Sequence, residues 1–170
     1  MSVFVLMGVS GSGKTTVGQC VARELDLPFI EGDEFHPQQN IDKMSAGIPL
    51  TEADREPWID ALAMGINQRE APHDVIVACS ALSHHVRDRL RKALAEPLHF
   101  IFLTAPAEVI QKRLDARPRH FMKSGMLQTQ LQALELPSNA ISVDANRPFP
   151  EVCRQVAAYV CERRMPGPQV

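Results

Sequence analysis

The sequence lacks the features that are typical of nucleic-acid-binding, membrane-spanning and secreted proteins. Its 170 residues carry a formal net charge of −2, so the chain lacks the basic excess on which electrostatic binding to nucleic acid depends. No apolar run is long enough to span a membrane. No basic and apolar leader precedes the glycines that begin at position 8, so we expect no cleavable signal peptide. Neither nucleic acid nor a membrane is therefore an expected partner.

Cysteine is also sparse, and no Cys-x-x-Cys spacing occurs. The four cysteines are Cys20, Cys79, Cys153 and Cys161, and all fall inside expected helices or strands. This placement favours buried, reduced thiols over a zinc site, and reduced thiols indicate a cytoplasmic protein.

What the sequence does have is a glycine-rich stretch near its start. From Gly8 to Thr15 it reads GVSGSGKT, which fits the phosphate-loop pattern. The apolar run Val3–Met7 before it predicts a buried strand, and apolar residues at helical spacing follow it. Glycines let backbone N–H groups converge on an anion, and the dipole of the following helix favours the same anion. We expect this loop to bind a nucleoside triphosphate.

Two polar residues of the loop have specific expected roles. Lys14 would reach the β- and γ-phosphates, and the Thr15 hydroxyl would ligate Mg²⁺. A chance glycine-rich turn is the alternative, but strand, turn and helix follow one another in the order that a phosphate loop requires. The residues expected to contact the nucleotide are Gly8, Ser10, Gly11, Ser12, Gly13, Lys14, Thr15 and Thr16.

Apolar strands alternate with helical segments along the chain. Further strands are expected at Pro28–Glu31, Val75–Cys79, His99–Leu103 and Ala140–Val143, with a loop at Glu34–Leu50 that contains one short helix near Ile41–Met44. The alternation predicts an α/β fold with a parallel sheet covered on both faces, and ligands at the carboxyl ends of its strands. We expect a single domain over residues 1–165 and a frayed tail over 166–170.

Two acidic residues end the expected second strand. Phosphoryl transfer needs an acceptor hydroxyl in line with the γ-phosphorus, and an aspartate can accept its proton, so Asp33 is a predicted catalytic residue together with Lys14 at the phosphates. Strand alternation would point Glu31 to the same side. A place at the Mg²⁺ hydration shell and a solvated turn carboxylate are equally open for Glu31. No Asp follows Val75–Cys79 and no Asn-Lys-x-Asp motif occurs, which favours a small-molecule kinase over an ATPase or a GTPase.

Further motifs make the comparison with one family specific. They are EGDEFHP from Glu31, NIDKM from Asn40, DREPW from Asp54, CSAL from Cys79, Arg87-Asp88, HFM from His120, Gln130, and LELP from Leu134. From Val3 to about Asp144 their order and spacing resemble the gluconokinase family of phosphate-loop kinases.

The resemblance implies a reaction and a fold. The reaction is transfer of the γ-phosphoryl group of ATP to the 6-hydroxyl of D-gluconate, giving 6-phospho-D-gluconate and ADP, with Mg²⁺ as second cofactor. The fold is that of nucleoside-monophosphate kinases, with strand order 2-3-1-4-5 and a lid at about 117–137. Homodimers occur in this family, so the resemblance suggests a homodimer. Two positions depart from the family pattern, Ser83 where Lys is common and Arg119 where Gly is common.

The cations expected in the site have different roles. An Arg can bind a carboxylate through two parallel bonds, and Arg87 is the first choice for the gluconate carboxylate because it follows the third strand, with Arg55 and Lys43 next. Arg117 is expected to be catalytic, closing with His120 over the transferring phosphate. The residues expected to contact the acceptor are Asp33, His36, Arg55, Ser80, Arg87, His120 and Gln130.

Arg113 shares a helix face with Arg117. A contact with the nucleotide and a role at the helix C-terminal dipole are both open for Arg113, and we include it among the nucleotide-binding residues.

Two other functions are open at this stage. Shikimate kinase, or another small-acid kinase on the same fold, would share the phosphate loop, but the His-Pro pair at 36–37 and Trp58 favour a gluconokinase. A nucleotide-sensing module without turnover is opposed by the intact Lys14, Thr15 and Asp33.

Overall fold

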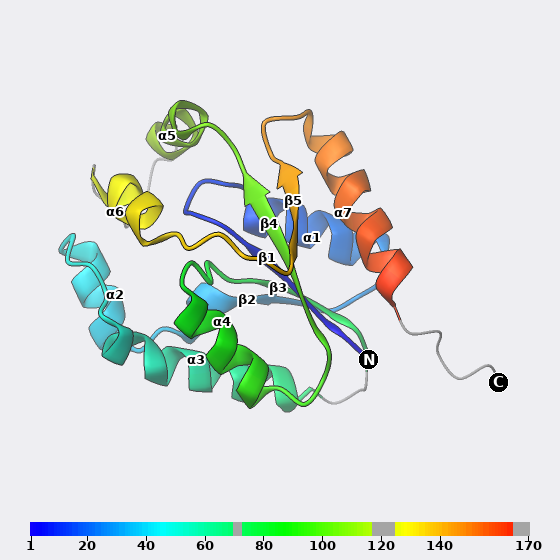
Figure 1. Cartoon of the computed structure of the whole chain (residues 1–170), viewed down its shortest axis with the longest axis horizontal. Coiled ribbons are helices and arrows are strands. Elements are labelled where there is room, and N and C mark those ends of the chain that lie inside the picture. The colour runs from blue at the N-terminus through cyan, green and yellow to red at the C-terminus, as the bar shows by residue number, and fades with distance from the viewer. Residues whose placement is uncertain (70–72, 117–124, 165–170) are drawn as a thin grey trace.

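A parallel sheet of five strands forms the framework of the computed structural model, which describes residues 1–69, 73–116 and 125–164. The strands are β1 (Val3–Met7), β2 (Phe29–Glu31), β3 (Val75–Ala78), β4 (Leu98–Thr104) and β5 (Ala140–Asp144). Their order in the sheet is β2-β3-β1-β4-β5 (Figure 1). The α/β class and the strand order expected from the sequence are therefore confirmed.

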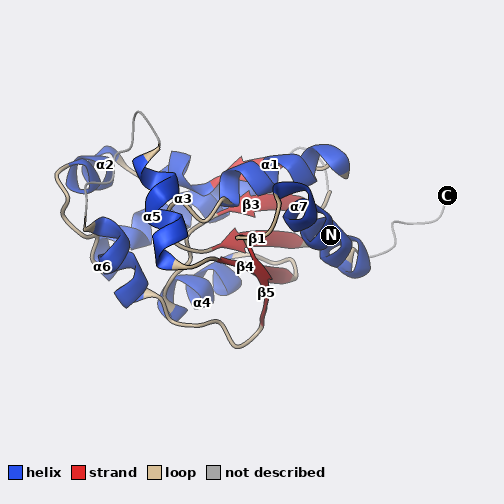
Figure 2. Ribbon diagram, turned by 90° about the horizontal axis from the view of Figure 1, so that it is seen from above, coloured by secondary structure: helices blue, strands red, loops and turns tan. Residues whose placement is uncertain are grey.

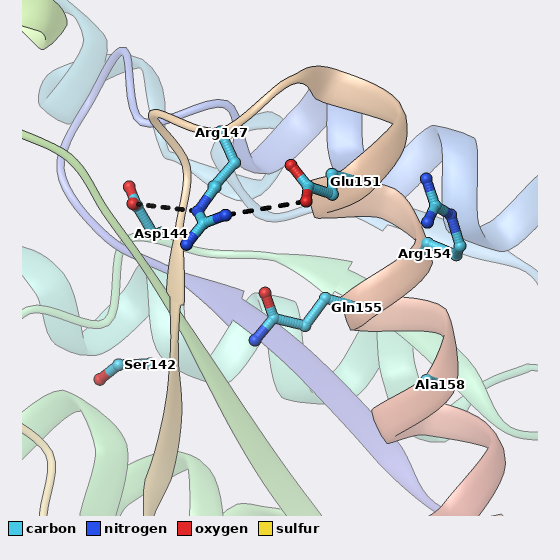
Figure 3. A pocket seen from close by; sticks show the side chains of 7 residues that line it. All are labelled: Ser142, Asp144, Arg147, Glu151, Arg154, Gln155 and Ala158. Atoms are coloured by element: carbon cyan, nitrogen blue, oxygen red, sulfur yellow. Dashed lines mark ion pairs between the residues drawn. The ribbon is translucent and has the colours of Figure 1, made fainter.

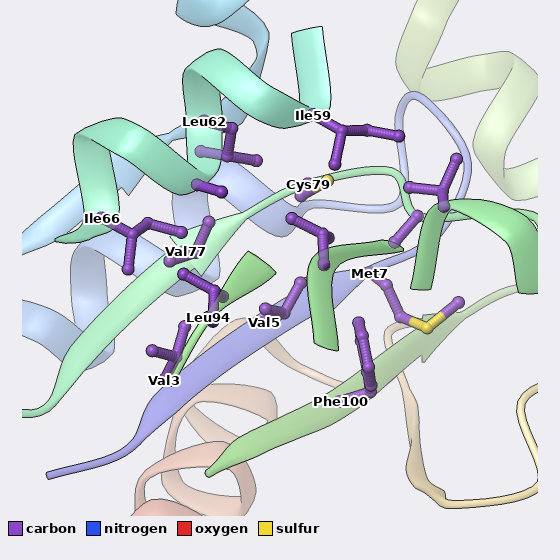
Figure 4. Close-up of a cluster of buried hydrophobic side chains, with 14 of the residues drawn as sticks. Val3, Val5, Met7, Ile59, Leu62, Ile66, Val77, Cys79, Leu94 and Phe100 are labelled. Carbon is purple, nitrogen blue, oxygen red and sulfur yellow. The ribbon is translucent and has the colours of Figure 1, made fainter. Parts of the chain in front are cut away.

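The central strand β1 shows how an uninterrupted apolar run defines this sheet. It pairs in parallel with β3 and with β4, and Val5 lies opposite Val77 on one side and Phe100 on the other. All five residues of β1 are buried. Because side chains alternate along a strand, Val3, Val5 and Met7 join one core cluster (Figure 4) and the two residues between them join the other.

Helices cover both faces of the sheet. On one face lie α1 (Lys14–Glu24) and α7 (Phe149–Arg163), and on the other α3 (Glu52–Asn67) and α4 (His84–Ala93) (Figure 1). Three further helices gather at the carboxyl ends of the strands (Figure 2): α2 (Gln38–Ser45), α5 (Ala107–Asp115) and α6 (Met126–Ala133). In parallel α/β sheets ligands bind at this end of the strands, so these three helices border the expected ligand site.

The segment before α3 departs most from expectation. The short helix near Ile41–Met44 is longer, spanning Gln38–Ser45, and a 3-10 turn η1 (Gly32–Phe35) precedes it. Neither element has enough apolar residues to give a periodic pattern. The N-terminus of α3 is fixed by a capping box, in which Thr51 Oγ1 accepts the N–H of Asp54 and Asp54 Oδ2 accepts the N–H of Thr51.

The cysteine prediction holds in part. Cys79 and Cys153 are buried, Cys20 is partly buried, and Cys161 is exposed on α7, so the expectation of a buried thiol is wrong for Cys161. Within the described ranges, no helix has the length and apolar character to cross a bilayer.

Candidate active site

A pocket of about 290 Å³ opens at the carboxyl ends of the strands. Its lining comes from the loop after β1, from η1, α2 and α3, from the loop after β3, and from α6. The polar lining residues are Ser10, Lys14, Asp33, His36, Arg55, Ser80, Ser83, Thr129 and Gln130. Residues far apart in the sequence that were expected to contact phosphate and acceptor thus lie around one cavity.

The phosphate loop joins β1 to α1, and two of its glycines meet different steric needs. A Cβ on Gly8 would lie 2.6 Å from the carbonyl oxygen of Leu103, so the chain can leave the sheet there only without a side chain. Gly13 is left-handed, with φ 99° and ψ 11°, and directs the chain into α1. The first turn of α1 has no acidic residue, so its N–H groups and dipole favour an anion.

Lys14 lies against the loop that it follows. Its Nζ donates to the carbonyl oxygens of Gly8 and Val9, each at 3.0 Å. Val9 also packs with Ile110 of α5 and Leu127 of α6 in a small apolar cluster. The loop is therefore held both by its own lysine and by two helices that cover it.

Thr15 and Glu31 form a close pair beside the loop. Thr15 Oγ1 donates to Glu31 Oε2 at 2.6 Å, so Glu31 is bound to the loop rather than solvated in a turn. Burial raises the pKa of Glu31 against the lowering effect of the Thr15 hydrogen bond, and the Asp33 charge raises it further. Mg²⁺ prefers hydroxyl and carboxylate oxygens and commonly takes one or two protein ligands beside phosphate and water. The pair fits such an ion.

Asp33 lies in η1, and its exposed carboxylate lines the pocket. The chain does not stay extended from Glu31 to Asp33, as alternation predicted, because it turns at Gly32. Glu31 Oε1 accepts the backbone N–H of Asp33 at 3.5 Å, so Glu31 caps the turn. The turn directs Asp33 toward the pocket while Glu31 remains with Thr15.

Trp58, the one tryptophan of the chain, packs against this turn. It is 1% exposed, and its Nε1 donates to the carbonyl oxygen of Gly32 at 2.7 Å. Its ring stacks on His36 with 4.4 Å between ring centroids and 13° between planes. One rigid side chain thus contacts the residue before Asp33 and the residue that follows η1.

Two other cations, Arg55 and Lys43, were candidates for binding the acceptor carboxylate, and they have different surroundings. Lys43 Nζ bonds Asp54 Oδ1 at 2.6 Å, and this bond, with the hydrogen bonds from Thr51, lowers the pKa of Asp54 to about 2. Arg55 is partly buried and lines the pocket. Arg55 therefore brings a cationic side chain to the pocket lining, whereas the charge of Lys43 is neutralised by Asp54.

Comparison with known proteins adds a second line of argument. A protein-family model described as Shikimate kinase matches residues 10–148. The thermosensitive gluconokinase of Escherichia coli K12 is 39% identical over 95% of this chain and 90% of that protein. The thermoresistant gluconokinase of the same organism is 42% identical over 86% of each. The chain belongs to the gluconokinase family.

Solved structures agree with membership of the gluconokinase family. A crystal structure of a gluconokinase from Sinorhizobium meliloti 1021 is 44% identical, with a TM-score of 0.83 over 95% of this chain and 92% of that one. A shikimate kinase from Bacteroides thetaiotaomicron is 18% identical, with a TM-score of 0.66 over 94% and 98%. That likeness shows the shared fold alone.

Arg87 does not line the pocket, unlike the expectation drawn from its place after β3. It is 1% exposed. Its Nη1 donates to the carbonyl oxygens of Ala81 and Leu82 at 2.7 and 2.9 Å. Its Nη2 donates to the carbonyl oxygen of Glu135 at 2.9 Å and lies 3.0 Å from His84 Nδ1. The guanidinium therefore joins the loop after β3 to the segment after α6, and the structure gives it an architectural role.

Replacing Arg87 with alanine should lower stability more than it affects acceptor binding. The change leaves buried carbonyl oxygens unpaired, which costs roughly 1–3 kcal/mol and, at this chain length, about 2–4 °C in Tm per kcal/mol. Thermal unfolding measures the shift, with Arg154→Ala as control because Arg154 is exposed on α7. An unchanged Tm together with a raised KM for the acceptor would restore Arg87 to the binding site.

Other expected site residues have defined places. Gln130 Oε1 on α6 accepts the N–H of Ser10 at 2.7 Å, which ties α6 to the phosphate loop. Arg113 Nη2 donates to the carbonyl oxygen of Ala145 at 2.6 Å, so it joins α5 to the loop after β5 and does not line the pocket. Ser83, where the family commonly has Lys, caps α4.

The expected lid is only partly described. Arg117, Arg119 and His120 lie outside the described residues, and the structure resumes at Gly125, just before α6.

Two polar residues were not expected in the site: Thr129, which lines the pocket, and Asn40, which contacts the lining residue His36. Asn40 is 2% exposed and contacts both His36 and Asp54. In the sequence Asn40 is only one member of the NIDKM motif, and its burial, which requires hydrogen-bond partners, appears only in the structure. The apolar part of the lining was missed as well, and it includes Ile41, Met44, Leu50, Leu82, Val86 and Met126.

A larger hollow of about 580 Å³ lies elsewhere, between the edge strand β5 and α7 (Figure 3). Arg147 lies 3.7 Å from Asp144 and 3.7 Å from Glu151 there. None of the expected site residues lines this hollow, so its size does not make it the active site.

Proposed function

We propose that this protein is a gluconokinase that transfers the γ-phosphoryl group of ATP to the 6-hydroxyl of D-gluconate, giving 6-phospho-D-gluconate and ADP. The observation that carries this proposal is the single pocket lined by Lys14, Asp33 and Arg55. Phosphoryl transfer needs a cation at the phosphates and a group that orients the acceptor hydroxyl. An anionic acceptor needs a further cation, which Arg55 supplies.

The steps of the reaction divide among the residues of this pocket. Lys14 and the loop N–H groups bind the phosphate oxygens, where negative charge develops during transfer. Asp33 accepts the proton of the 6-hydroxyl while the oxygen of that hydroxyl forms a bond to the γ-phosphorus. The bond from the γ-phosphorus to the bridging oxygen breaks at the same time, and ADP leaves with that oxygen. Lid closure excludes water, which otherwise competes as acceptor.

Thr15, with Glu31 beside it, is the proposed position for Mg²⁺. The 2.6 Å hydrogen bond between their side-chain oxygens brings two suitable ligands together. When bound there, the ion supplies positive charge at the β- and γ-phosphates.

The remaining features of the enzyme follow the family. We propose one domain over residues 1–165, a lid over 117–137 and a tail over 166–170. We further propose a cytoplasmic homodimer, and the buried free thiols of Cys79 and Cys153 are compatible with a reducing compartment.

One acceptor panel tests the reaction. ADP release from ATP and Mg²⁺ is measured by a coupled assay with gluconate, shikimate, glycerate and nucleoside monophosphates. We expect turnover with gluconate. Preferred turnover with shikimate would replace the proposal by the shikimate kinase alternative, and ATP binding without release of ADP for any acceptor would indicate a nucleotide sensor.

Arg55→Ala should weaken acceptor binding selectively. Loss of a charged hydrogen bond to a carboxylate costs roughly 1.5–3 kcal/mol, or about one to two powers of ten in KM for gluconate, with little change in KM for ATP. Steady-state kinetics with gluconate and with glucose, which has no carboxylate, measure the effect. Lys43→Ala is the matched control because Asp54 neutralises that charge. A preference for gluconate over glucose that stays constant in Arg55→Ala contradicts the assignment.

A further inference from the structure

A hydrogen bond to a backbone carbonyl oxygen determines the orientation of the Asn40 side-chain amide. Asn40 lies in α2 and is 2% exposed. Its Nδ2 lies 2.8 Å from the backbone carbonyl oxygen of Asp54. A carbonyl oxygen can only accept a hydrogen bond, so the amide atom that faces it must be the NH₂ nitrogen.

This orientation decides the tautomer of His36. The same Asn40 Nδ2 lies 3.3 Å from His36 Nδ1, and its second hydrogen is available to that nitrogen. An NH₂ group does not accept, so His36 Nδ1 must be the acceptor and carries no proton. In the neutral imidazole the proton then lies on Nε2.

The His36 ring is also fixed in its plane. It stacks on Trp58, whose own indole is held by its hydrogen bond to Gly32. His36 lines the pocket. With one ring face covered by Trp58 and Nδ1 occupied by Asn40, the N–H at Nε2 is the polar group of this ring that remains for a ligand in the pocket.

Burial favours the neutral form of the His36 ring, while the nearby charges act in opposite directions. Burial lowers its pKa most, the Asp33 carboxylate of η1 raises it, and the Arg55 guanidinium of α3 lowers it. Lys43 of α2 and Asp54 of α3 form an ion pair with each other. A proton on Nδ1 would also point at the Asn40 NH₂ group.

We propose that Asn40 is a positioning residue of the acceptor site, which holds His36 as the Nε2–H imidazole so that this N–H donates to a hydroxyl oxygen of a polyhydroxy-acid acceptor. The assignment of the acceptor rests on the proposed function. The arrangement divides the work between two neighbouring side chains, because Asp33 can accept a proton from one hydroxyl while His36 donates to another. The arrangement favours acceptors that carry a second hydroxyl within reach of His36 Nε2.

The tautomer is tested without any substrate. Long-range ¹H–¹⁵N NMR spectra of the ¹⁵N-labelled wild-type protein distinguish protonated from unprotonated ring nitrogens, and His36→Gln assigns the His36 signals among the six histidines. We expect Nε2 protonated and Nδ1 unprotonated at neutral pH. The Nδ1–H tautomer, or an imidazolium, in wild type overturns the inference whether or not any Asn40 variant folds.

Variants then test the role of Asn40. Asn40→Ala should shift His36 toward a mixture of tautomers and raise KM for gluconate about tenfold, with kcat and KM for ATP changed much less. Asn40→Asp should place a proton on Nδ1, since a carboxylate accepts there. Gln39→Ala, exposed on the same helix, is the matched control and should leave the spectrum unchanged. An Asn40→Ala protein with the wild-type tautomer and KM contradicts the proposal.

The two hypotheses fail separately. If wild-type protein shows the Nε2–H tautomer but does not phosphorylate gluconate, the proposed reaction is wrong while the coupling of Asn40 to His36 stands. If gluconate is phosphorylated and Nδ1 carries the proton, the reaction stands and the role of Asn40 is wrong.

Discussion

Replacing Lys14 with alanine is expected to remove nearly all phosphoryl transfer while the fold persists. Its ammonium group is the cation of the phosphate loop that lines the pocket, and removing one preorganised donor from a developing charge costs about 10²–10³ in kcat. Lys14 is only partly buried and contributes to neither large apolar cluster. Initial rates of ADP release at saturating ATP and gluconate measure the loss.

The control for Lys14→Ala is Lys92→Ala, which removes an exposed lysine at the end of α4. Circular dichroism and the thermal unfolding midpoint of both variants check the fold. Because Lys14 Nζ also bonds two loop carbonyl oxygens, a small fall in Tm is compatible with the assignment. Near wild-type turnover in a folded Lys14→Ala protein would remove the phosphate loop from the mechanism.

Asp33→Asn is expected to reduce kcat by about 10²–10⁴, the usual range for a proton-transfer group. The amide keeps the shape of the side chain but cannot accept the hydroxyl proton. KM for ATP should change little because Asp33 lies in η1 and not in the phosphate loop. Steady-state kinetics with each substrate varied in turn separate the two effects.

Glu31→Gln is the comparison that gives Asp33→Asn its meaning. Glu31 bonds Thr15 and caps η1, so its change should raise the Mg²⁺ concentration needed for half-maximal rate more than it lowers kcat. A larger loss of kcat in Glu31→Gln than in Asp33→Asn would mean that the roles of the two carboxylates are reversed.

What the sequence could predict depends on how local each feature is. The phosphate loop lies within eight successive residues between an apolar strand and a helix, so pattern alone locates it. The inward face of α3 can also be predicted from pattern alone. Its residues Trp58, Ile59, Leu62 and Ile66 follow helical spacing, and all are buried.

Arg87 shows where such reasoning stops. Its place shortly after β3 indicates the correct end of the sheet, but not the direction of its side chain. The loop before it turns back at Ala81, which has a φ of 44°, and presents carbonyl oxygens to the guanidinium. Buried carbonyl oxygens need donors, and this need follows from the path of the backbone, which no residue pattern states.

Asn40 was missed for a related reason. In the sequence it is one polar residue in a polar segment, and such residues are usually exposed. It is buried because α2 packs beside the start of α3, where the carbonyl oxygen of Asp54 is within reach. Only the tertiary arrangement distinguishes it from its exposed neighbours Gln38 and Gln39.

The contact between Trp58 and His36 also makes the acceptor site directly observable. Trp58 is the one indole of the chain, so tryptophan emission reports from a single place, and its ring lies against a residue that lines the pocket. Quenching or enhancement of that emission therefore reports acceptor binding beside Asp33, and the measurement needs neither a label nor turnover. Stopped-flow mixing with an acceptor, before and after nucleotide is added, can thus give the order in which the two substrates bind.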